Sequence, residues 1–181
     1  MPVYIIVVIK RSIMKNIKKY LSIIALFALA FPAAVNAQDV ARNEKKVRHN
    51  AGIKHLIESQ RYVFEARSVS PTGGQTRQLT SYYDLIIKGD SLLSFLPYFG
   101  RAYVAPISTT DGGIRFTSTT YDYEVSARRK GGWHIKIIPK DVSTVQQMNL
   151  SISASGQASL NVTSNNRQPI SFMGVIREPR N

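Results

Sequence analysis

The 181-residue sequence predicts a mainly antiparallel, all-β fold, an up-and-down β-barrel of about eight or nine strands preceded by one N-terminal α-helix. Short segments of alternating apolar and polar residues follow one another from residue 61 onward, at the regular spacing of a barrel or a sandwich. Short turns join several of them into hairpins, and a meander of hairpins favours the barrel. Closure would also remove exposed strand edges from a chain that has no cysteine for disulfides.

The first 37 residues are predicted to be a secretory signal peptide. A lysine-rich segment precedes the apolar run 20–34, and Val35-Asn36-Ala37 has the small residues that signal peptidase reads. The apolar run is shorter than the roughly 20 residues that span a bilayer, so a retained anchor helix is the alternative. We expect the true start at Met14, because the residues before it add a second apolar run that a signal peptide does not need.

Cleavage after Ala37 would leave 144 residues, the size of one domain, exported to the periplasm or the extracellular space. Since the chain has no cysteine, no lipid anchor can follow the cleavage site, and we expect a soluble product without a membrane span. Five of the 24 basic residues lie in the signal peptide, so 19 basic residues face 11 acidic ones, a net charge of +8. This surplus favours anionic partners such as envelope glycolipids or acidic polysaccharide, although an ordinary solubilising charge explains it equally. Export argues against nucleic acid.

A helix is predicted over 38–60, followed by the barrel domain over 61–181. The helical segment has no proline, and Asp39 is placed as an N-cap. The pattern also predicts strands outside the two clearest hairpins, at 61–67, 82–88, 91–96, 114–121 and 170–176.

The two clearest hairpins follow Ile114 and Pro139. In the first, apolar residues alternate with polar ones from Tyr121 to Ala127 and resume at Trp133 after Lys130-Gly131-Gly132. A three-residue loop containing glycine would place Ala127 opposite Ile135 and Val125 opposite Ile137, with all four on one face. The second hairpin is predicted to turn at Ser155-Gly156-Gln157.

Several strings together resemble the domain of unknown function family 4251, exported proteins typical of the Bacteroidetes. In order, they are GDSLLSFLPYFGRAYVAP (89–106), GGIRF (112–116), KGGWHIKIIPKD (130–141) and SNNRQPISFMG (164–174). The family's fold is similar to lipocalin-like β-barrels, so the resemblance implies a lipocalin-like barrel here. It implies no activity, because the family has none assigned.

The sequence contains no recognisable catalytic constellation. Cysteine is absent, no HExxH, GxSxG or Walker-type motif occurs, and the three histidines are not spaced as a metal site. We therefore expect no enzymatic activity, no metal and no cofactor. A hydrolase is a further alternative, with its carboxylates drawn from Asp84, Asp90, Asp111, Asp122 and Glu124.

Aromatic residues and arginines gather in a segment shaped by proline and glycine, where a guanidinium could clamp a carboxylate or phosphate while rings cover an apolar body. The alternative is an aromatic plug that closes a barrel end. The candidate ligand-binding residues are Tyr98, Phe99, Arg101, Tyr103, Arg115 and Phe116. A separate basic surface is predicted at Arg128, Arg129 and Lys130.

These observations predict an exported barrel that binds a small amphipathic or anionic ligand in its mouth. The alternative is an envelope interaction protein with a filled barrel that binds another envelope component through its surface. Both leave the oligomeric state open.

Overall fold

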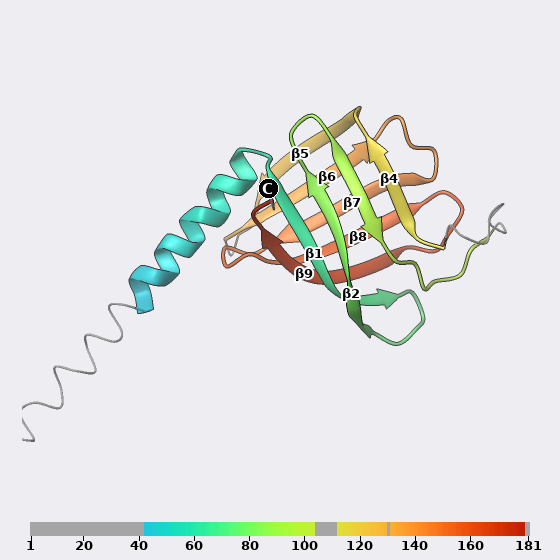
Figure 1. The fold of residues 1–181 in the computed structure, drawn as a ribbon, viewed down its shortest axis with the longest axis horizontal. Coiled ribbons are helices and arrows are strands. Elements are labelled where there is room, and N and C mark those ends of the chain that lie inside the picture. The colour runs from blue at the N-terminus through green and yellow to red at the C-terminus, as the bar shows by residue number, and fades with distance from the viewer. Residues whose placement is uncertain (1–41, 104–111, 130, 180–181) are drawn as a thin grey trace, which may run out of the picture. The chain divides into compact units, whose positions relative to one another are not determined.

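The computed structural model describes residues 42–103, 112–129 and 131–179, which form one helix and nine β-strands (Figure 1). The helix covers residues 42–58. The strands are β1 (Tyr62–Pro71), β2 (Arg77–Ile87), β3 (Leu92–Leu96), β4 (Ile114–Ser118), β5 (Tyr121–Ala127), β6 (Trp133–Pro139), β7 (Val145–Ile152), β8 (Gln157–Ser164) and β9 (Ile170–Arg177). The predicted signal peptide lies outside the described residues.

All nine strands belong to one sheet, in the order β4-β3-β2-β1-β9-β8-β7-β6-β5, and every neighbouring pair is antiparallel. The two strands at the ends of this order, β4 and β5, are separated by only two residues. They also run in the same direction. Together they form one bent strand, along which the chain passes from one edge of the sheet to the opposite edge. The sheet thereby nearly closes into a barrel, which confirms the predicted antiparallel fold with a preceding helix.

A carboxylate holds the bend between β4 and β5. Asp141 accepts hydrogen bonds from the Ser118 hydroxyl at 2.5 Å and from the Thr119 backbone N–H at 2.9 Å. The hydrogen bond from Ser118 and, to a smaller extent, the one from Thr119 lower the pKa of Asp141 below its ordinary value. The segment after β6 is therefore bonded to the end of β4.

Apolar side chains fill the interior of the barrel. The largest fully buried ones come from both halves of the sheet: Tyr62, Phe64, Phe172, Leu85, Ile87, Leu92, Leu96, Ile135, Ile137, Met148, Leu150 and Ile152. Ile53 and Ile57 of the helix join this core, while residues 42–49 are exposed. At the turn between β7 and β8, a side chain on Gly156 would collide with Ile53, so glycine there permits the helix to pack closely.

The two predicted hairpins form, but the pairing of the first differs from the prediction. Val125 pairs with Ile135 and Tyr123 with Ile137, two residues away from the expected register. The hairpin closes at Arg128, whose N–H donates to the Gly132 carbonyl, and Gly131 supplies a positive φ of 83° inside the loop. A shift by two residues keeps the same side chains on the same face, so the apolar face was predicted correctly.

The second hairpin turns one residue earlier than predicted. The Ser153 N–H donates to the Gln157 carbonyl at 2.8 Å, and Gly156 has a φ of 79°. Both turns therefore place glycine as the last loop residue, directly before the closing pair. No helix in the described part of the chain has the length and apolarity to cross a membrane.

Candidate functional site

The loop 97–103 is bonded to the loop 165–169 at the end of the barrel where β3 ends and β9 begins. The Tyr98 hydroxyl donates to the carbonyls of Arg101 at 2.8 Å and Gln168 at 3.0 Å. The backbone adds bonds from the Gln168 N–H to the Arg101 carbonyl and from the Tyr103 N–H to the Asn166 carbonyl. Partial burial raises the pKa of Tyr98 above its ordinary value. Tyr98 thus holds the two loops together through its hydrogen bonds.

Three arginines at this end lie over aromatic rings. The guanidinium carbon of Arg115 is 4.4 Å from the ring centre of Phe95, which also stacks on Tyr83 at 5.6 Å. The corresponding distances are 5.1 Å between Arg167 and Tyr98 and 5.4 Å between Arg77 and Phe99. Stacking through the flat face leaves the edge of a guanidinium, which carries its N–H donors, directed away from the ring.

The structure separates some of the predicted site residues and joins others. Tyr98 and Arg101 meet through the hydrogen bond described above. Arg115 and Phe116 are neighbours on β4 and face opposite ways, with Arg115 exposed and Phe116 packed against the core. Phe99, Arg101 and Tyr103 are exposed.

A small cleft lies where the sheet does not close, between the start of β4 and the loop before β9. Its volume is about 120 Å³, and it is lined by Gly113, Ile114, Arg115, Thr144, Val145, Ser164, Asn166 and Arg167. Arg167 Nη1 donates to the Gly113 carbonyl at 3.0 Å, which holds that guanidinium against the start of β4. Asn166 Oδ1 is buried and has no hydrogen-bond partner among the described residues.

The size of this cleft decides what it can hold. Pockets for whole small molecules are about 300 to 1,000 Å³, whereas one water takes up about 30 Å³ of liquid. A volume of about 120 Å³ accommodates a carboxylate, sulfate or phosphate group with an adjoining hydroxyl. Two arginines and one unsatisfied acceptor among the lining residues make the cleft suitable for such a group.

Larger hollows in the described chain lie outside the barrel interior. Two of about 710 Å³ each flank the helix and share Leu56 and Glu178 in their lining. One of about 530 Å³ lies along β5, β6 and β7, where Glu124 and Lys136 line it. Each of them has charged residues in its lining, and such residues are solvated on surfaces.

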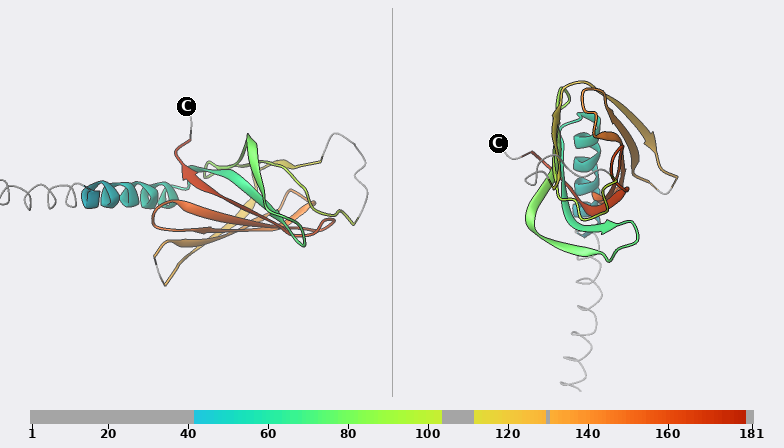
Figure 2. Two further views of the ribbon diagram at one scale, coloured as in Figure 1. Left: turned by 90° about the horizontal axis from the view of Figure 1, so that it is seen from below. Right: turned by 90° about the vertical axis from the view of Figure 1, so that its right-hand side faces the viewer.

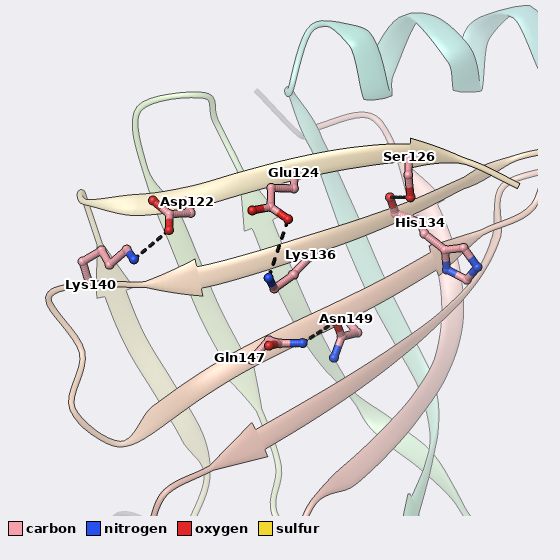
Figure 3. A network of polar contacts seen from close by, with 8 residues as sticks. All are labelled: Asp122, Glu124, Ser126, His134, Lys136, Lys140, Gln147 and Asn149. Atoms are coloured by element: carbon pink, nitrogen blue, oxygen red, sulfur yellow. Dashed lines mark hydrogen bonds and ion pairs between the residues drawn. The ribbon is translucent and has the colours of Figure 1, made fainter.

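Two lysines of the hairpin that carries the predicted basic surface are paired with carboxylates (Figure 3). Lys140 Nζ is 2.7 Å from Asp122 Oδ2, and Lys136 Nζ is 3.6 Å from Glu124 Oε2. Arg128 and Arg129 are exposed at the tip of the hairpin. Lys130, the third residue of the predicted basic surface, lies outside the described residues.

One pair of side chains combines a hydroxyl with a base. The Ser151 hydroxyl and His134 Nδ1 are 2.8 Å apart on the outer face of β6 and β7. A serine nucleophile also needs a group that orients the base and donors for the developing oxyanion. The described chain places no such group on the His134 ring, and its described residues contain no cluster of three or more metal-binding side chains.

Sequence reasoning missed Arg77, Asn166 and Arg167. Arg167 and Arg115 are 52 positions apart, and only closure of the barrel brings β4 beside the loop before β9. The polar run from Ser164 to Gln168, directly before the last strand, was the available signal.

Fold and site together define a nearly closed antiparallel β-barrel with a filled interior and a cationic cleft at one end. The chain belongs to the DUF4251 family: the model of this domain of unknown function matches residues 44–176. This confirms the resemblance found in the sequence. A search of the curated proteins gave no match.

A solved structure supports the same fold. The crystal structure of a DUF4251 family protein from Bacteroides eggerthii DSM 20697, determined at 1.95 Å resolution, is similar with a TM-score of 0.54. The two chains are 17% identical, and the match covers 72% of this chain and 87% of that one. At this identity, the similarity concerns the fold.

Proposed function

We propose that this protein is an exported, non-enzymatic binding module that holds an acidic sugar unit of an envelope carbohydrate at the cleft between β4 and the loop before β9. The observation that carries this proposal is the composition of the cleft. It brings together two arginines, Arg115 and Arg167, and the buried Oδ1 of Asn166, which has no hydrogen-bond partner among the described residues.

The three groups require two kinds of partner at once. Guanidinium groups bind carboxylate, sulfate and phosphate through charge-assisted hydrogen bonds. The Asn166 oxygen requires a donor, because a buried acceptor without one costs about 1 to 3 kcal/mol. An acidic sugar offers an anionic group and a neighbouring hydroxyl donor, and it therefore satisfies the whole lining.

The filled interior supports a site on the barrel end rather than inside the barrel. Tyr62, Phe64 and Phe172 are fully buried in the centre, and the 120 Å³ of the cleft suffice for one charged unit of a longer chain. The exposed Arg101 and the stacked Arg77 lie at the same end of the barrel, where they would attract a polyanion. Export rests on the predicted signal peptide.

Calorimetric titration of the processed protein with a galacturonic acid oligosaccharide tests the proposal. We expect binding that a neutral galactose oligosaccharide of the same length does not give. Replacing Arg115→Gln should weaken binding by about ten- to a hundredfold, because a hydrogen bond to a charged group contributes about 1.5 to 3 kcal/mol.

The control is Arg129→Gln, which removes the same charge from the exposed hairpin tip. We expect it to change affinity by less than about threefold, as a distant screened charge does. Equal losses in the two variants would mean that only net charge matters, and they would refute the cleft. Absence of binding to the acidic oligosaccharide would refute the proposed function.

Replacing Asn166→Ala examines the sugar specificity separately. The variant should lose affinity for the acidic oligosaccharide while keeping the weaker binding of inorganic sulfate, which carries no hydroxyl donor for Asn166. Equal losses for both probes would contradict the role given to the Asn166 oxygen.

A further inference from the structure

The two edge strands of the sheet, β4 and β5, differ in the contacts they make beyond their strand partners. Both ends of β4 are bonded across the seam, because the Ser118 hydroxyl and the Thr119 N–H donate to Asp141 and Arg167 donates to the Gly113 carbonyl. Along β5, the contacts beyond β6 are made by side chains near its start: the Tyr121 hydroxyl donates to the Gly89 carbonyl at 3.0 Å, and Tyr123 bonds to Tyr62. The remainder of β5 extends away from these contacts, and its hairpin projects from the barrel (Figure 2).

The hydrogen bonds of the hairpin determine which backbone groups of β5 face outward. The Arg128 N–H donates to the Gly132 carbonyl, and the Lys140 N–H donates to the Thr120 carbonyl. In an antiparallel pair, bonded residues alternate with unbonded ones, so the even-numbered residues of β5 bond to β6. The N–H and C=O groups of Tyr121, Tyr123, Val125 and Ala127 therefore point to the other edge, which pairs with no strand in the described part of the chain.

Exposure is greatest in the second half of this edge. Val125 is 48% exposed, although it pairs with Ile135, which is 1% exposed. Ser126 and Ala127 are also exposed. An unpaired strand edge beside an exposed valine is a template for pairing with another strand, and natural proteins cover or charge such edges.

The charges along β5 are complementary to those of a second, antiparallel copy of β5. Two copies of β5 can pair antiparallel around a two-fold axis at any residue position of β5, provided that odd-numbered residues, which have the outward backbone groups, pair with odd-numbered ones. With the axis at Val125, Asp122 of one copy lies opposite Arg128 of the other. Glu124 then lies opposite Ser126, so no two like charges face each other.

The other axes are less favourable. An axis at Glu124 would place this carboxylate opposite its own copy, and an axis at Ser126 would pair only residues 125–127 of β5 with one another, against 123–127 for an axis at Val125. An axis at Tyr123 would place Asp122 opposite Glu124, and directly opposed like charges destabilise a strand pair. An axis at Ala127 would pair mostly residues of the turn beyond the end of β5.

We infer that the free edge of β5 binds β5 of a second copy of this chain, forming a two-fold symmetric dimer with Val125 on the axis. The pairing joins the outward backbone groups of Tyr123 to those of Ala127 in the partner copy and buries the exposed valine against its counterpart. Asp122, whose side chain is 51% exposed and bonded to Lys140 through Oδ2, also contacts the partner's arginine. This inference is independent of the proposed carbohydrate site at the other end of the barrel.

Sedimentation velocity of the processed protein over a range of concentrations tests the dimer and its register. Asp122→Arg and Arg128→Asp should each weaken dimerisation by about tenfold, because each turns two attractive cross-strand pairs per dimer into repulsive ones. The double variant Asp122→Arg/Arg128→Asp should recover most of the loss. A wild-type protein that stays monomeric at every soluble concentration, or a double variant no better than the single ones, would overturn the inference.

Disulfide trapping gives an independent measurement, because the chain contains no cysteine. Residues paired across an antiparallel ladder have Cα atoms about 5.5 Å apart, within the range of disulfides. Val125→Cys should therefore form a covalent dimer rapidly under mild oxidation. Met173→Cys, at a site of similar exposure (55%), should form one only by slow random collision, and equal rates in the two variants would contradict the assigned axis.

Discussion

A hydrogen bond between two tyrosines joins strands that are not neighbours in the sheet. Tyr62 Oη of β1 and Tyr123 Oη of β5 are 2.9 Å apart. Tyr62 is 0% exposed, whereas Tyr123 is only partly buried. Burial is the leading reason why the pKa of both hydroxyl groups is raised. This bond connects β5 to the core on the side where β5 has no strand partner.

The difference in burial predicts unequal effects of removing either hydroxyl. Tyr123→Phe leaves the buried Tyr62 hydroxyl without a partner, which costs about 1 to 3 kcal/mol of unfolding free energy. Tyr62→Phe leaves the Tyr123 hydroxyl within reach of water and should cost about 0.5 to 1.5 kcal/mol. In the double variant Tyr62→Phe/Tyr123→Phe no polar group is left unsatisfied, so its cost should be smaller than the sum of the single costs.

Urea unfolding of the four proteins, followed by tryptophan fluorescence, measures these free energies as a double-mutant cycle. Trp133 lies on β6, beside β5, and reports on this region. Additive costs would show that the two hydroxyl groups do not interact. A smaller cost for Tyr123→Phe than for Tyr62→Phe would refute the reasoning from burial.

Three further predictions concern pH and the backbone. Burial raises the pKa of Tyr123 to about 12, so the stability that its neutral form contributes is complete below pH 10 and is lost as the pH rises to about 12. Over this pH range, the melting temperature of the wild type should therefore fall more steeply than that of Tyr123→Phe. Because the pKa of Asp141 is lowered, the stability that its ionised form contributes is present above about pH 4 and is lost as the pH falls. Asp141→Asn should therefore lower the urea midpoint at pH 7, and its difference from the wild type should become smaller in acid. Gly132→Ala should destabilise the protein by several kcal/mol, because φ is 93° and the added methyl group would overlap the Ile152 carbonyl. Gly131→Ala, with a φ of 83° and only an ordinary contact to Ala154 Cβ at 4.0 Å, should cost about 1 to 2 kcal/mol, and equal urea midpoints would contradict this difference.

Local patterns in the sequence were sufficient to predict the architecture. Alternation over residues such as Tyr123 and Val125 identified the strand faces, and the turn glycines located the hairpins. The register of the first hairpin was wrong by two residues, because alternation specifies a face and leaves shifts of two residues undetermined. Only the position of the closing bond at Arg128 settles the pairing.

The candidate site depended on contacts that local patterns do not contain. The segment around Tyr98 was identified from its aromatic and arginine content, and the structure shows Tyr98 bonded to Gln168, 70 positions away. Arg167 and Asn166 join Arg115 only because β4 and β5 form one bent strand that leaves a seam in the barrel. No periodicity in the sequence marks such a bend, since its two halves read as two ordinary strands.

An NMR titration of the isotope-labelled, processed protein with the galacturonic acid oligosaccharide tests the central claim most directly. The account predicts saturable changes in the backbone signals of Gly113, Arg115, Ser164 and Asn166, with the signals of the interior strands unchanged. Changes concentrated in core residues such as Phe64 and Phe172 would place the ligand inside the barrel and contradict the account.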